Sequence, residues 1–177
     1  MSGIHDAVMN RTQAMLQKAL ITDIGEDDPA LAGVVKVGPL QGEPEPDDAR
    51  ISICIYENDP DDLEGAEWQD RVTEVECGGV VTFERRFTIK GRMLLVDTGE
   101  ELTVARSIAS TVKERIEIAL LKEQYVGIAS GNEYVARGPL ADAIVSNLRQ
   151  GGGPPDAFDI SFKIRFDILT TRTGVFS

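Results

Sequence analysis

The sequence predicts an α+β fold: a mostly antiparallel sheet with two main helices packed on one face. The strongest observation is an unbroken alternation from Phe158 to Ile168. Phenylalanine or isoleucine occupies every even position of this segment, and polar residues occupy the odd ones: Asp159, Ser161, Lys163, Arg165 and Asp167. Successive side chains of a strand point to opposite faces. A strand with one apolar and one polar face is typical of antiparallel or mixed sheets covered on one side only.

Two amphipathic segments predict the helices. From Ile4 to Leu20, apolar residues recur at roughly helical spacing without an interrupting Gly or Pro. The second helix follows Thr98, a predicted N-cap with Glu101 three residues later, as in a capping box. We expect it to end near residues 122–124. Its apolar stripe, which we expect to pack on the sheet, consists of Leu102, Ala105, Ala109, Val112, Ile116 and Ala119.

Other apolar or alternating segments predict the remaining strands. A long segment, 80–96, fits one strand or two joined strands, with Gly91 at a bulge or bend. For 139–150 the pattern favours a short helix that begins at Pro139; the alternative is a strand that leads through the glycine run into Phe158. The other predicted strands are 34–37, 51–56, 71–76 and a pair at 125–129 and 133–137.

Composition suits a single domain, residues 1–177, with acidic loops at about 38–50 and 57–70. The net charge of −12 argues against sequence-specific or free nucleic-acid binding, which needs a basic surface. Cys54 and Cys77 do not make a disulfide framework, which fits folding in a reducing compartment. The sequence shows neither a signal-peptide pattern nor an apolar stretch near the ~20 residues that span a bilayer. We therefore expect a soluble protein without a membrane partner.

No motif for catalysis, metal or cofactor binding stands out. The one histidine, His5, is interpreted as a surface residue near a frayed end rather than a general base, which argues against histidine-based triads. One His and two Cys cannot supply a standard set of zinc ligands. Residues 58–64 are rich in oxygen ligands but lack the spacing of a calcium loop. The glycine run 151–153 precedes two prolines, which lack the amide donors of a phosphate cradle. We expect no catalytic residue, no metal and no cofactor.

Charged and aromatic residues in unusual positions indicate contact surfaces instead. Arg85 falls on the apolar face of its strand, where it must reach water, an acidic partner or another subunit. Its neighbour Arg86 lies on the polar face. We predict inter-subunit pairing for both arginines. Trp68 follows an acidic run and either anchors an interface or folds back over the sheet. We predict one loop contact formed by Asp59, Asp61, Asp62, Glu64 and Trp68.

These features together resemble a tail terminator of a tailed bacteriophage, or the related cap protein of contractile injection systems. The resemblance covers most of the chain and is one of pattern, without a sharp motif. It comprises an N-terminal amphipathic helix, an apolar strand that ends in Tyr, a long strand before the capped helix, and a closing alternating strand. The corresponding sequences are IHDAVMNRTQAMLQKAL, ARISICIYEND, VVTFERRFTIKG, EELTVARSIASTVKERIEIAL and FDISFKIRFDILT.

The resemblance implies a structural virion protein without enzymatic activity. Such a protein is made in the host cytoplasm and forms a ring, usually a hexamer, at the neck-proximal end of the tail. The ring sits on the last ring of the tube protein, stops tube polymerisation and presents a surface to the head-completion protein. In contractile tails it also holds the end of the sheath, and the genome can pass through the ring. The family has no fixed functional residues to carry over.

Three alternatives remain at this point. The chain could be another head–tail connector or a tube protein. It could be a small acidic enzyme that uses carboxylates, with a divalent metal at Asp59, Asp61 or Glu64. It could also be a cytosolic binding module with no viral role.

Overall fold

The computed structural model describes residues 3–22, 33–38, 51–57, 71–76, 79–96, 101–123, 125, 128–130, 134–139, 144–152 and 157–173. These residues form one sheet and two main helices, as the sequence predicts. Some predictions lie outside the described residues: most of both acidic loops, the N-cap Thr98, and the contact residues Asp59, Asp61, Asp62, Glu64 and Trp68.

The described residues form a mostly antiparallel sheet of eight strands. These are β1 (Val35–Val37), β2 (Ile51–Glu57), β3 (Arg71–Glu76), β4 (Val80–Val96), β5 (Ile128–Ser130), β6 (Tyr134–Arg137), β7 (Val145–Gly152) and β8 (Ala157–Arg172). Their order is β1-β2-β4-β8-β6-β5, with β3 also paired to β4 and β7 also paired to β8. Among the described strands, only β1 and β2 run parallel.

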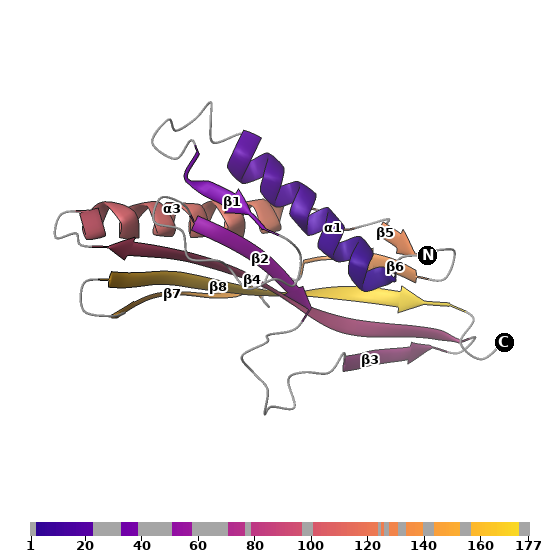
Figure 1. Ribbon diagram of the computed structural model, residues 1–177. Helices are drawn as coiled ribbons and strands as arrows, with labels where there is room; N and C mark the ends of the chain where they lie inside the picture. The colour runs from indigo at the N-terminus through magenta and orange to yellow at the C-terminus, as the bar shows by residue number, and fades with distance from the viewer. Residues whose placement is uncertain are drawn as a thin grey trace.

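β4 and β8 form the spine of the sheet (Figure 1). They pair from Val81 opposite Arg172 to Val96 opposite Ala157 without a shift of register. The segment 80–96 is therefore one strand, not two. The outer edge of each spine strand is divided between two partners. β3 and β2 follow each other along β4, and β6 and β7 divide the edge of β8.

Both helices cover the same face of the sheet (Figure 1). α1 (Ile4–Leu16) continues into a π-helical turn, η1 (Gln17–Thr22), and α3 spans Glu101–Lys122. α1 and η1 bury Ile4, Val8, Met9, Met15, Leu16 and Leu20. The predicted apolar stripe of α3 is confirmed from Ala105 onward: Ala105, Ala109, Val112 and Ile116 are buried and Ala119 is half-buried against the core, joined by buried Leu120, whereas the Leu102 side chain lies outside the described residues.

The core fills the space between the helices and the alternating strands. The even positions of β8 from Ile160 to Ile168 are at most 3% exposed, which confirms the alternation. Phe87 of β4 stacks on Phe166 of β8, with their ring centroids 5.7 Å apart. Facing aromatic pairs of this kind add to the stabilisation from apolar burial. The other strand residues of this core are Ile51, Ile53, Ile55, Ile89 and Met93.

The opposite face of the spine is polar but less exposed than the alternation predicts. Most of its side chains are half-buried, and Thr88 and Asp167 are buried completely or almost completely. Long charged side chains on neighbouring strands lie across this face and bond one another, as Arg92 does with Asp159 at 2.7 Å. We call it the polar face: Arg86, Thr88, Lys90 and Arg92 of β4 with Asp159, Ser161, Lys163, Arg165 and Asp167 of β8.

The helix predicted over 139–150 is wrong in its second half, where the chain forms β7. This strand pairs with β8 from Val145 opposite Arg165 to Gly152 opposite Phe158. The alternative, a strand that leads into Phe158, is therefore confirmed. Ile144 and Leu148 satisfy helical spacing and strand alternation equally, so the short pattern cannot separate them. Pairing with the edge of β8, a tertiary contact, decides the conformation.

Gly91 is not a bulge or bend. It lies opposite Ile53 and Phe162 in two ladders that show no shift of register at this point. Its role is to leave room for the Phe162 ring. A Cβ atom at residue 91 would lie 2.3 Å from Cζ of Phe162, and real Cβ atoms do not approach other atoms so closely.

We predict that Gly91→Ala lowers the free energy of unfolding by about 1–3 kcal/mol, the usual cost of overpacking a core. Urea unfolding measures this loss. Gly151→Ala is the matched control, because its added Cβ would meet nothing nearer than the Asp159 carbonyl oxygen at 4.0 Å. In a Phe162→Ala background the cost of Gly91→Ala should fall by more than half. Equal stability of the two glycine variants would contradict the steric explanation.

Candidate functional site

Arg85 is the centre of a buried polar network at the start of α1. The residue is 8% exposed and lies on the helix-covered face of β4. Its Nε donates to Thr170 Oγ1 at 2.6 Å, and its Nη1 donates to His5 Nε2 at 2.5 Å. The guanidinium also lies 5.0 Å from the centre of the Phe83 ring. This network joins α1, β4 and β8, so Arg85 has intramolecular partners in the interior.

His5 belongs to this network, and the interpretation as a frayed surface residue is wrong. Its side chain is 24% exposed, and its Nδ1 lies 3.2 Å from Glu57 Oε2. A guanidinium only donates, so Nε2 accepts from Arg85 and the proton of the neutral ring lies on Nδ1. The lone pair that a general base would need is thus engaged by Arg85. The arrangement joins the start of α1 to the end of β2.

Arg86 points to the other face of β4. Its Nε donates to Asp167 Oδ1 at 3.0 Å, and its Nη2 donates to Asp167 Oδ2 at 3.3 Å. Asp167 is 2% exposed, so the paired arginine compensates a buried carboxylate. Arg85 and Arg86 therefore do not share a surface. Their predicted inter-subunit role stays a prediction, and both guanidinium groups also have partners within the chain.

Removal of the Arg86 guanidinium should destabilise the fold. We predict that Arg86→Gln lowers the free energy of unfolding by about 3 kcal/mol, because a buried carboxylate loses its partner. Lys113→Gln, which removes a half-buried ion pair with Glu117 one helical turn away on the same helix, should cost less, about 1 kcal/mol or below. Urea unfolding compares the two variants. Similar small losses would show that Asp167 finds adequate compensation elsewhere.

Tyr125 is a titratable group with a clearly shifted pKa. Its side chain is fully buried, and burial raises the pKa of the hydroxyl above its ordinary value; a hydrogen bond with Thr12 acts in the opposite direction. Thr12 Oγ1 donates to the Val8 carbonyl at 2.8 Å, so the Tyr125 hydroxyl donates to Thr12 across 2.9 Å. This bond joins α1 to the segment after α3.

The raised pKa makes stability fall at high pH. The folded protein holds the Tyr125 proton more tightly than the unfolded chain, whose tyrosine pKa is about 10. Stability from this group is complete below pH ~10 and decreases above it by about 1.4 kcal/mol per pH unit. We predict that Tyr125→Phe costs about 1 kcal/mol at pH 7 and that this cost shrinks above pH ~10. Urea unfolding at several pH values measures it; a pH-independent difference would contradict the prediction.

β3 is an exposed edge strand. Among the described residues it pairs only with β4, and Figure 1 places it at the sheet margin away from both helices. Every described side chain from Val72 to Glu76 is exposed, including Val72 at 53% and Val75 at 59%. A register shift between Val72 and Glu74 interrupts the ladder. The sequence predicts this strand but not its exposure, which depends on what the helices leave uncovered.

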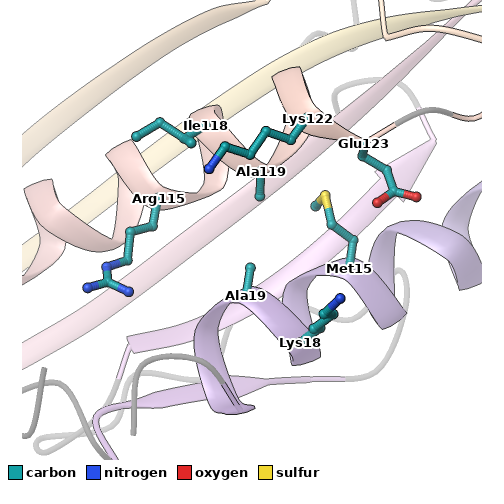
Figure 2. A pocket seen from close by; sticks show the side chains of 8 residues that line it. All are labelled: Met15, Lys18, Ala19, Arg115, Ile118, Ala119, Lys122 and Glu123. Atoms are coloured by element: carbon teal, nitrogen blue, oxygen red, sulfur yellow. The ribbon is translucent and has the colours of Figure 1, made fainter. Parts of the chain in front are cut away.

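A groove lies between α1–η1 and α3 (Figure 2). Its hollow is about 300 Å³, and Met15, Ala19 and Ala119 lie at its apolar centre. Three cations, Lys18, Arg115 and Lys122, surround it, with Ile118 and Glu123 completing the lining. Sequence reasoning missed this groove. The only signal was the spacing of Arg115 and Lys122, seven residues apart and so on one face of their helix.

Other site classes find no support in the described part of the chain. None of its His, Cys, Asp and Glu side chains gather in a group of three or more that could hold a metal ion. No helix among these residues has the length and apolar character needed to cross a bilayer. Comparison with protein-family models and with curated proteins gives no match.

Proposed function

We propose that this protein is a structural component of a phage-like tail, a terminator that assembles into a ring and caps the tail tube. The exposed edge of β3 is the observation that supports this best. An unpaired strand edge offers backbone donors and acceptors to a partner strand. Val72 and Val75 add apolar contact area beside those backbone groups. Contacts between unlike surfaces of identical chains close into rings when the rotation permits.

A terminator must form a finite assembly, and β3 has features that limit open growth. The register shift between Val72 and Glu74 breaks the regular ladder that strand-by-strand stacking requires. Glu74 and Glu76 are exposed on the same strand and repel a second copy of themselves. Such an edge favours one specific partner over repeated addition. This supports a cap more than the alternative of a tube protein, which polymerises without limit.

The remaining parts of the proposal follow from the resemblance. In the tail, the ring would sit on the last ring of the tube protein and end its polymerisation. Its other surface would receive the head-completion protein, and in a contractile tail its margin would hold the sheath. The networks of Arg85 and Arg86 stabilise the subunit whose surfaces make these contacts.

The edge of β3 can be tested by a matched pair of substitutions. We predict that Val75→Lys raises the concentration for half-assembly at least about tenfold, equivalent to ~1.4 kcal/mol. Val104→Lys is the control, because Val104 is exposed to 60% on α3, away from the edge. Analytical ultracentrifugation and negative-stain microscopy measure assembly, and purified tail tubes provide the capping assay. Long polymers of the wild type would favour a tube protein; normal rings of Val75→Lys would contradict a role for β3.

A further inference from the structure

The groove between α1–η1 and α3 gathers positive charge on a strongly acidic protein. Lys18 comes from η1, and Arg115 and Lys122 come from α3, so two separate elements contribute the cations (Figure 2). Within the described residues, Lys18 and Lys122 make no ion pair or hydrogen bond. The one acid of the lining, Glu123, is engaged by Arg11 at 2.5 Å. The chain as a whole carries a net charge of −12. Like charges brought together repel, and a bound anion would relieve that repulsion.

The apolar part of the groove indicates more than a simple anion. Its centre consists of Met15, Ala19 and Ala119. Ile118, which also lines the groove, is 41% exposed. The hollow of about 300 Å³ is at the small end of the range for binding pockets. It therefore suits one large apolar side chain, held by a segment whose carboxylates meet the surrounding cations.

We propose that the groove binds the acidic segment 57–70 of a second copy of this chain, with Trp68 as the apolar anchor. This segment, ENDPDDLEGAEWQD, contains no Lys or Arg and includes the only tryptophan of the protein. Its acids beyond β2 are Asp59, Asp61, Asp62, Glu64, Glu67 and Asp70; Glu57 itself ends β2 and lies against His5. Charge and apolar content are thus both complementary to the groove.

Geometry favours a second copy over the same copy. Trp68 is three residues before Arg71, where β3 begins, so it reaches at most about 11 Å from that point. β3 lies at the sheet margin away from both helices (Figure 1). Arg71 pairs with Glu84, next to Arg85, which contacts His5 in the first turn of α1. The groove begins at Met15, about 15 Å further along that helix.

This inference rests on the proposed ring and supplies a contact for it. The acidic segment of one copy and the groove of the next are unlike surfaces, so the contact is head-to-tail. Repetition of such a contact closes a ring or continues as a filament, according to the rotation between copies. The contact would also place five predicted residues, Asp59, Asp61, Asp62, Glu64 and Trp68, in one interface.

A peptide titration tests the groove directly. The probe is the synthetic peptide 57–70, and the protein carries Trp68→Phe, so the peptide holds the only indole. We expect saturable binding that weakens at least about tenfold in Lys18→Glu/Lys122→Glu and falls with added salt. Lys18→Gln/Lys122→Gln, a milder variant, should give a smaller loss. Arg106→Glu, at an exposed position on the same helix, is the control and should bind normally.

A charge-reversed peptide and the assembly of the variants test the proposal further. A peptide with Asp61→Lys and Asp62→Lys should prefer the charge-reversed protein. No binding of the native peptide, binding insensitive to the groove substitutions, or equal binding of a scrambled peptide would overturn the proposal. If Lys18→Glu/Lys122→Glu forms the same rings as the wild type, the groove contact is wrong, but the proposed ring function is not contradicted. Groove-dependent peptide binding by a wild type that never forms rings would support the contact and reject the terminator.

Discussion

The continuous pairing of β4 with β8 is the constraint on which the rest of the structure depends. Sixteen-residue β8 and its partner keep one register from end to end, so each side chain of the spine has a defined face. A slip of one residue would exchange the apolar core for the charges of the polar face. Gly91 favours this register, because only a residue without a side chain leaves room for the Phe162 ring opposite it.

Burial of Arg85 on the apolar face follows from how α1 is attached to this spine. An arginine inside a core is tolerated only when its donors are used, and Thr170 and His5 use them here. The start of α1 is thereby fixed over β4 and β8, while Tyr125 fixes the middle of the same helix through Thr12. Two polar contacts at different turns define how the helix lies. That orientation in turn sets the groove beside α3.

Much of the fold could be predicted because local alternation and helical stripes report directly on burial, as in β8 and α3. The misassigned features depended on distant partners. β7 is a strand because β8 offers it an edge, and His5 is fixed by Arg85, 80 positions away in sequence. Exposure of Val72 and Val75 depends on where the helices end. The groove requires cations from two helices whose relative placement no local pattern encodes.

β2 and β3 divide the outer edge of β4 and have different roles: β2 contributes to the folded core, and β3 is available for association. β2 supplies buried isoleucines to the core, whereas the described side chains of β3 from Val72 to Glu76 are all exposed. Detachment of β3 would thus break backbone hydrogen bonds without opening the interior, and such local opening costs less than global unfolding. β3 can therefore change its conformation on contact with a neighbouring protein, or change its sequence, without altering the buried core.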